Sequence, residues 1–275
     1  MKSYLVNEGD FPLNVRTWDE LINFAISKNP VDRNKIKDLL KKTNLIQKGL
    51  PQVPVFHQFQ SIEEKIFLVQ SFLNQLEYNY TGMQFFKINK FKSILSLMDE
   101  AKKIISSSLP IKCLEAIILG IYLTNDLESV ERFGIGFISQ FEGVEYKHIV
   151  LGLYANQRFG SIGLSRRSNL MYKPLIYKSL YDLLKEFKKC YEEDKHLLFV
   201  NYMSSSIEHH AFVSDVVNWQ LLNINYLKLN EETIVKQLNS YSDYISHKPE
   251  RMGSKKRIEL ADKPRHWIHK VTWTQ

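Results

Sequence analysis

The segment that most constrains the fold runs from Lys112 to Thr124 and is apolar on nearly every side of the helix that it predicts. A helix with apolar residues all round has no face for solvent, so it must lie at the centre of a folded domain. Pro110 precedes it and breaks any helix on that side. The rest of the chain therefore has to supply layers around this helix, and 275 residues are enough to bury a substantial core.

The N-terminal part of the chain is predicted to be helical. Capping boxes, in which serine or threonine precedes glutamate by three residues, begin two helices at Thr17 with Glu20 and at Ser61 with Glu64. The first would cover residues 17–28. A second short helix and an extended connector at Val53-Pro54 are expected between them. This part would form a helical annex to the core.

The chain changes character after Asn125, where β-branched and aromatic residues become frequent. Turns at Glu142-Gly143 and at Arg158-Phe159-Gly160 would join antiparallel hairpins. The predicted strands are Phe133 to Phe141, Val144 to Ala155, Ser161 to Arg166, Leu197 to Tyr202 and Phe212 to Leu222, and the remaining helices are 93–107, 112–124, 179–194 and one after Asn230. This pattern predicts the α+β class, with helices packed on one antiparallel sheet.

The net charge of +7 favours an acidic partner, which could be nucleic acid, an anionic membrane or an acidic polypeptide. No nucleic-acid-binding motif is recognisable, so nucleic acid is the weakest of the three. No apolar run is long enough to span a bilayer, and the first residues lack the apolar region of a signal peptide. Two cysteines give no disulfide framework. We therefore expect a protein of the reducing cytoplasm.

Cys113 stands at the predicted start of the central helix, next to Lys112. The helix dipole and the lysine ammonium would both stabilise a thiolate, which is the nucleophilic form. His148 on one predicted strand and Ser165 on the next could supply a base and its orienting group, as thiol catalysis requires. Position alone leaves the alternative open that Cys113 is a small core residue and His148 a hydrogen-bonded core histidine.

Other reactive side chains fit structural roles. Cys190 lies at helical spacing from Phe187 and is interpreted as a core residue. No metal is expected, because His209, His210, His247, His266 and His269 lack the spacing of a metal site. Arg166 and Arg167 would ordinarily be solvated, but beside a thiol site their guanidinium groups match a carboxylate.

Several segments carry a resemblance to a known family. They are Tyr78-Asn79-Tyr80-Thr81-Gly82, Leu109 to Asn125, His148 to Gly152, Ser165-Arg166-Arg167 and Leu170 to Pro174. Together they resemble the vasohibins, which are tubulin tyrosine carboxypeptidases. The resemblance extends from about Tyr4 to residue 243 and is loose around residues 204–225. It implies a transglutaminase-like or papain-like cysteine protease core, removal of the C-terminal tyrosine of α-tubulin, and a microtubule-associated place in the cytoplasm.

The resemblance also implies a role for individual residues. Cys113 matches the nucleophile of the family, His148 the general base and Ser165 the third member of a Cys-His-Ser triad. Tyr78 matches the tyrosine that helps to hold the oxyanion, while Lys112 and Arg166 match the residues that bind the terminal carboxylate. A small helical vasohibin-binding protein is expected on the N-terminal helices, and no cofactor is expected.

The acidic tubulin tail suits a basic groove, for which Lys90, Lys92 and Lys147 are candidates. We divide the chain into a partner-binding annex (residues 1–77), a catalytic core (78–245) and a basic tail (246–275), which carries eight Lys or Arg against three Asp or Glu. Two alternatives stay open: a carboxypeptidase for another acidic tail that ends in an aromatic residue, and a microtubule-binding scaffold without activity.

Overall fold

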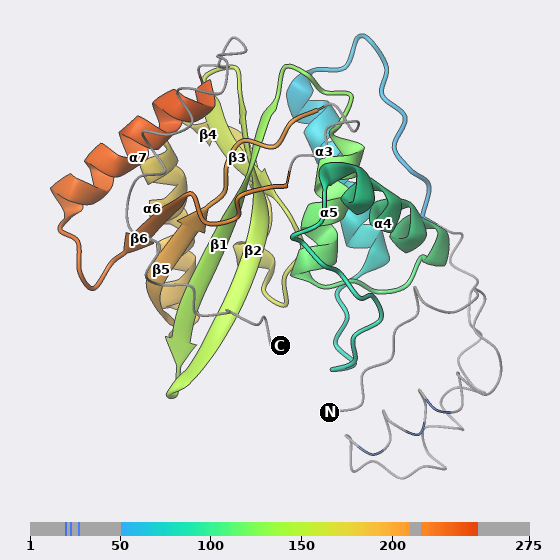
Figure 1. Ribbon diagram of the computed structural model, residues 1–275, viewed down its shortest axis with the longest axis horizontal. Coiled ribbons are helices and arrows are strands. Elements are labelled where there is room, and N and C mark those ends of the chain that lie inside the picture. Colours follow the sequence, from blue (N-terminus) through green and yellow to red (C-terminus); the bar gives the residue numbers. More distant parts are fainter. Residues whose placement is uncertain (1–19, 21–22, 24–26, 28–50, 210–215, 247–275) are drawn as a thin grey trace. The chain divides into compact units, whose positions relative to one another are not determined.

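The computed structural model of the protein describes residues 51–209 and 216–246, together with Glu20, Asn23 and Ser27, which are helical (Figure 1). The rest of the predicted helix at 17–28, the second short helix and nearly all of the basic tail lie outside the described residues. The contacts between residues divide the chain into two compact units, each of which is described by itself. The predicted domain boundaries at residues 77 and 245 stay predictions.

Between residues 51 and 127, the first unit has the helices α3 (Ile62–Leu76), α4 (Ile94–Ser107) and α5 (Cys113–Leu123), and it also includes the segment Ile162–Tyr172. The capping box predicted for α3 is present, with Ser61 accepting from the backbone of Glu64 and the Glu64 carboxylate accepting from Ser61. Both α3 and α4 pack on α5. Eight of the eleven residues of α5 are buried, so the central apolar helix is confirmed.

The second unit is built on a six-stranded sheet with the order β4-β3-β2-β1-β5-β6. Its strands are β1 (Glu131–Phe141), β2 (Val144–Ala155), β3 (Arg158–Ile162), β4 (Lys173–Tyr177), β5 (Leu197–Met203) and β6 (Leu222–Asn225). The pairs β1–β2, β1–β5, β3–β4 and β5–β6 are antiparallel. Positive φ angles at Glu142 and Gly143 confirm the predicted turn between β1 and β2. The α+β class is confirmed.

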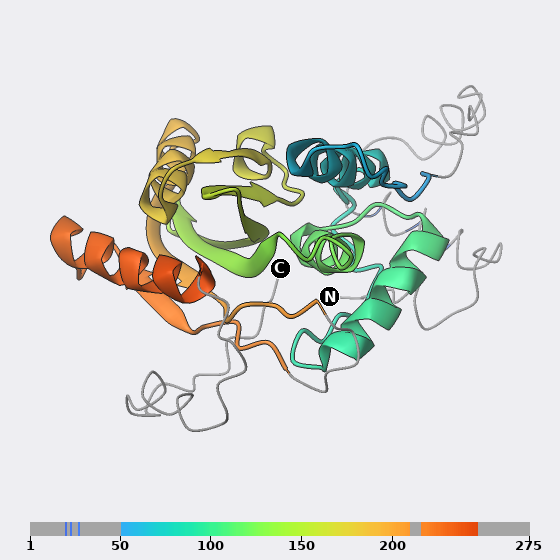
Figure 2. The ribbon, with the colours of Figure 1, turned by 90° about the horizontal axis from the view of Figure 1, so that it is seen from above.

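Two helices cover one face of β1 (Figure 2). The Phe187 ring of α6 (Leu180–Glu193) lies 4.7 Å from the Phe137 ring, and the Tyr241 ring of α7 (Glu231–Ser246) lies 5.6 Å from the Phe133 ring. Both helices begin where the sequence predicted, after caps at Ser179 and Asn230. None of the helices in the described part of the chain is long and apolar enough to cross a bilayer.

The prediction for the second hairpin was wrong. Its turn is at Asn156 and Gln157, which both have positive φ, and Arg158-Phe159-Gly160 belongs to β3. Gly160 suggested a turn, but it is needed for close packing, because a Cβ there would lie 2.8 Å from the carbonyl oxygen of Lys173. Because the turn comes earlier than predicted, β3 begins at Arg158 and ends at Ile162. Ser165 therefore lies in a loop rather than on a strand.

The last part of the sheet also differs from the prediction. Within the predicted strand from Phe212 to Leu222, residues 217–221 are not in a strand, and β6 begins only at Leu222. Val216 makes an isolated bridge with Ser93. The sequence analysis missed β4, which contains Pro174 and lies at the edge of the sheet, where a missing backbone N–H is tolerated.

Candidate functional site

Cys113 is the first residue of α5, and its side chain is half-buried. The backbone N–H of Ala116 donates to the carbonyl oxygen of Lys112, which makes Lys112 the residue that caps the helix. N–H groups in the first turn of a helix have no partner within the helix and form the positive end of its dipole. These N–H groups and the adjacent Lys112 support the expected thiolate at Cys113, which stays a prediction.

Lys112 and Glu115 are two buried ionisable residues at the start of this helix. Lys112 is 5% exposed and Glu115 1%, and the Glu115 carboxylate accepts the Lys112 backbone N–H at 3.1 Å. Burial lowers the pKa of the Lys112 ammonium, and the nearby Glu115 charge partly offsets this. Burial likewise raises the pKa of Glu115, against the hydrogen bonds that it accepts. A second of these comes from the Gln84 side-chain amide, at 2.8 Å.

Tyr78 is held beside the start of α5 by two backbone hydrogen bonds. The N–H of Asn79 donates to Ile111 at 2.8 Å, and the N–H of Ile111 donates to Glu77 at 3.1 Å. Burial and the charge of Cys113 raise the pKa of the Tyr78 phenol, while Arg166 acts in the opposite direction. The Tyr78 hydroxyl therefore keeps its proton, and with it the ability to donate a hydrogen bond, to a higher pH than an ordinary tyrosine.

Ser165 and Arg166 lie in the loop that follows β3, and α3 fixes this loop. The buried Gln70 side chain of α3 accepts the N–H of Gly163 at 3.0 Å and donates to its carbonyl oxygen at 2.9 Å. Two residues later, the Ser165 hydroxyl oxygen accepts the N–H of Arg167 at 3.3 Å. The conformation of the loop is thus set by contacts on both sides of Leu164.

Electrostatic interactions join four of the predicted site residues into one cluster within the first unit. The guanidinium carbon of Arg166 lies 5.8 Å from the centre of the Tyr78 ring, at the distance of a cation–π contact. Arg166 and Cys113 both influence the pKa of Lys112, in opposite directions. In such a cluster the thiol can attack a carbonyl carbon, and the phenol can donate a hydrogen bond to the resulting oxyanion. The two cations can bind an anion.

His148 belongs to the second unit and lies in the middle of β2. It is 9% exposed and pairs across the sheet with Phe137, on which its ring stacks at 5.8 Å between ring centres. The Phe137 ring in turn contacts Phe187 and Tyr191 of α6. The imidazole therefore rests on an aromatic platform that restricts its rotation. The convergence of Cys113, His148 and Ser165 stays a prediction.

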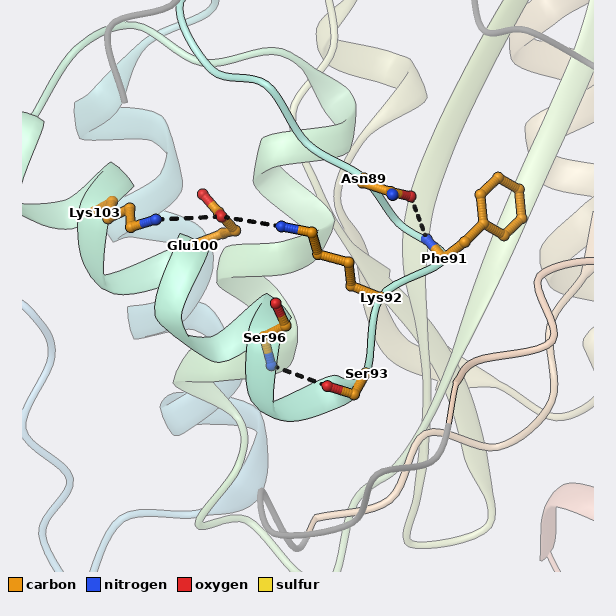
Figure 3. Close-up of polar contacts among 7 residues, drawn as sticks. All are labelled: Asn89, Phe91, Lys92, Ser93, Ser96, Glu100 and Lys103. Carbon is orange, nitrogen blue, oxygen red and sulfur yellow. Dashed lines mark hydrogen bonds and ion pairs between the residues drawn. The ribbon is translucent and has the colours of Figure 1, made fainter. Parts of the chain in front are cut away.

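The three lysines predicted for an acidic-tail groove differ in their surroundings. Lys90 is 5% exposed, with its ammonium 5.3 Å from the Phe91 ring. Figure 3 shows that Lys92 reaches Glu100 at 4.0 Å, and Lys103 reaches the same carboxylate at 3.3 Å. Two cations thus share one anion, which leaves positive charge there. Lys147 pairs with Glu145 at 3.2 Å. The groove itself stays a prediction.

Residues that support the site escaped the sequence analysis. Glu115 has the spacing of a capping box with Lys112, but the usual pattern has serine or threonine at the capping position, so lysine there gives no signal. Gln70 and Gly163 are 93 residues apart, and nothing in the sequence links them. Asn79 is buried, donates to Met83 and accepts from Thr81, so it fixes the Tyr78 loop. Among the described residues, no group of three histidine, cysteine, aspartate or glutamate side chains could hold a metal ion.

Comparisons with known proteins place the chain in a family. A model of the vasohibin family matches residues 2–246 of the chain. Mouse Tubulinyl-Tyr carboxypeptidase 1 is 34% identical to the chain over 239 residues, which make up 87% of this chain and 64% of the mouse protein. The chain thus spans somewhat less than two thirds of the length of that relative.

Proposed function

The chain belongs to the vasohibin family, and from this premise we propose that it is a cysteine carboxypeptidase that removes the C-terminal tyrosine of α-tubulin. The observation that carries the proposal is the cluster at the start of α5, where Lys112 adjoins Cys113 and interacts electrostatically with both Cys113 and Arg166. A carboxypeptidase must recognise a free terminal carboxylate beside the bond that it cleaves. The name of the mouse relative, Tubulinyl-Tyr carboxypeptidase 1, supports tubulin as the substrate.

In the proposed reaction, the Cys113 thiol gives its proton to His148, and the sulfur attacks the carbonyl carbon of the last peptide bond, forming a C–S bond while the carbonyl oxygen becomes an oxyanion. His148 protonates the tyrosine nitrogen as the C–N bond breaks, so that tyrosine leaves as a neutral amine and a thioester remains. His148 then takes a proton from water, whose oxygen attacks the thioester. The C–S bond breaks, and the shortened chain leaves with a carboxylate. Ser165 would orient the imidazole as the third member of the triad.

The tetrahedral intermediates carry a negative oxygen that needs donors. The Cys113 backbone N–H, at the start of α5, and the Tyr78 hydroxyl are the proposed donors. The raised pKa of Tyr78 supports this role, because only the protonated phenol can donate. A serine stabilises an imidazolium less than an aspartate would, so these donors would contribute a large share of the rate enhancement.

The terminal carboxylate would be bound by Lys112 and Arg166. The guanidinium of Arg166 can donate two parallel hydrogen bonds to a carboxylate, whereas the buried Lys112 acts as a single charge. The acidic residues that precede the terminal tyrosine would pass the positive cluster of Lys92 and Lys103. Binding to an acidic tail should therefore weaken as salt is added.

We extend the proposal to a partner, a small helical vasohibin-binding protein, and to α3 as part of its seat. Phe67 is 58% exposed on α3, and a hollow of 430 Å³ is lined by Gln60, Glu63, Glu64, Phe67 and Leu68. An apolar side chain in a hollow with an acidic rim suits an amphipathic helix that carries basic residues. A Phe67→Asp variant should lose the partner in a pull-down.

The expected location of the protein is the cytoplasm, on microtubules.

The decisive experiment incubates the full chain with tubulin, with and without the partner, and follows the α-tubulin tail by mass spectrometry. We expect loss of one terminal tyrosine, and we expect Cys113→Ala to abolish it. Cys190→Ala is the matched control, because it removes the other cysteine and should leave the reaction intact. An intact tail under all conditions, with retained binding to microtubules, would replace the proposal by the scaffold alternative.

A further inference from the structure

Tyr80 is an exposed aromatic side chain next to the cluster at the start of α5. Its exposed fraction is 69%, although an isolated tyrosine ring gains by burial. The ring lies edge-on to the Tyr78 ring, with 5.0 Å between ring centres and 61° between ring planes. Its hydroxyl donates a long hydrogen bond of 3.4 Å to the backbone oxygen of Arg166. Tyr80 thus contacts Tyr78, a proposed oxyanion donor, and the backbone of Arg166, a proposed carboxylate ligand.

The loop that carries Tyr80 is fixed on both sides of the ring. Asn79 is 2% exposed, and its side chain donates to Met83 at 2.9 Å and accepts the backbone N–H of Thr81 at 3.0 Å. Gly82, with φ of 74°, allows the turn that follows. The ring is therefore ordered by its neighbours while one face stays open to solvent. An ordered, exposed aromatic surface loses little conformational entropy when a ligand covers it.

The terminal residue of a peptide carries its side chain and its carboxylate on the same Cα atom. When the carboxylate is bound by Arg166 and Lys112, the terminal side chain must lie within one residue's reach of them. Tyr80 is within this reach, because its ring lies 5.0 Å from the Tyr78 ring, and the guanidinium carbon of Arg166 lies 5.8 Å from that same Tyr78 ring. We propose that the Tyr80 ring is the surface on which the substrate's terminal side chain packs, and that it favours an aromatic over an aliphatic terminus. This inference rests on the proposed carboxypeptidase function.

The test measures peptide binding and cleavage separately. Acidic peptides of one sequence, ending in Tyr, Phe or Leu, are titrated against the Cys113→Ala chain, which binds without turnover. We expect Tyr80→Ala to reduce the ratio of affinities for Tyr over Leu about three- to tenfold, the effect of one aromatic pair. Tyr80→Phe keeps the ring and should keep the ratio within about twofold. A ratio cancels any general damage to the site.

Leu227→Ala is the matched control, because Leu227 is 68% exposed and belongs to the second unit. An unchanged ratio in Tyr80→Ala, or an equal change in Leu227→Ala, would overturn the role of Tyr80. Cleavage by the unmodified chain is then measured on the same peptides. An aromatic preference in binding without any cleavage would overturn the proposed function and leave the role of Tyr80 standing. Failure to bind any of the peptides would overturn both.

Discussion

Cys113 and Cys190 each have a lysine and a glutamate nearby, but they lie at opposite ends of their helices and differ in exposure to solvent. Lys112 and Glu115 accompany Cys113, whereas the Cys190 sulfur lies 3.3 Å from the Lys173 ammonium and 3.8 Å from the Glu186 carboxylate. Cys113 begins its helix and is half-buried, while Cys190 lies in the last turn of α6 and is 4% exposed.

The electrostatic consequence differs accordingly. Burial raises the pKa of the Cys190 thiol, and the neighbouring Lys173 only partly offsets it. A lysine next to a cysteine is therefore not enough to make a thiolate when the sulfur is desolvated at the wrong end of a helix. The comparison teaches that helix position and access to solvent, rather than neighbouring charge, separate a candidate nucleophile from a core thiol.

The largest expected effect is a difference in alkylation rate between the two cysteines. With iodoacetamide at neutral pH, Cys113 should react at least about a hundredfold faster than Cys190, because only Cys113 is accessible and stabilised as a thiolate. Peptide mass spectrometry over time measures both rates in one sample. The unfolded chain is the control, since there the two rates should be similar. Equal rates in the folded chain would refute the contrast drawn here.

The next effect concerns the loop of Ser165 and Arg166. Gln70→Ala leaves the N–H and carbonyl of Gly163 without their buried partner, which should lower the free energy of unfolding by about 2 kcal/mol. A displaced loop should also reduce kcat/KM for the tubulin tail about tenfold. Asn74→Ala is the matched control, because it removes another contact of Gln70 and spares Gly163. A loss of stability with unchanged kcat/KM would make Gln70 purely structural.

Local sequence patterns were sufficient to predict most helices and the first hairpin. The cap at Ser61, the proline before α5 and the Glu142-Gly143 turn each act through residues a few positions apart. The family and the α+β class were also predicted correctly from the sequence. These features depend on short-range geometry or on long motifs, which a single sequence displays directly.

The errors arose where residues distant in the sequence meet. Gly160 was predicted to be a turn residue, because its close packing against β4 is not visible in the sequence. β4 was missed because it is short and contains Pro174. The clamp of Gln70 on Gly163 has no sequence signal at all. The sequence therefore names candidate site residues, whose convergence stays a prediction, but it gives no sign of the contacts that hold their loops.

A smaller effect should appear in the pH dependence of peptide binding. The pKa of Lys112 is lowered, so its ammonium is lost as the pH rises, before the ordinary lysine value of 10.5 is reached. Affinity for a terminal carboxylate should then fall several-fold on the alkaline side, while the raised pKa of Tyr78 keeps its phenol protonated. Binding to the Cys113→Ala chain measures this without interference from a thiolate.

Two variants sharpen the assignment of this titration to Lys112. Glu115→Gln removes the charge that raises the pKa of Lys112, so affinity should begin to fall at a lower pH. Lys112→Arg keeps its charge throughout the range and should abolish the dependence. A profile that is identical in all three chains would show that another group titrates.

The smallest effect is expected at Cys190, where Lys173→Met tests the other side of the comparison. Lys173 lies 3.6 Å from Glu186, whose side chain is 37% exposed, so solvent can replace the lost partner and the free energy of unfolding should change by no more than about 1 kcal/mol. Removing the cation that lowers the pKa of Cys190 should slow its alkylation further. Urea unfolding and the alkylation assay measure the two quantities. Faster alkylation of Cys190 would instead mean that Lys173 shields the sulfur, and access rather than charge would then govern both cysteines.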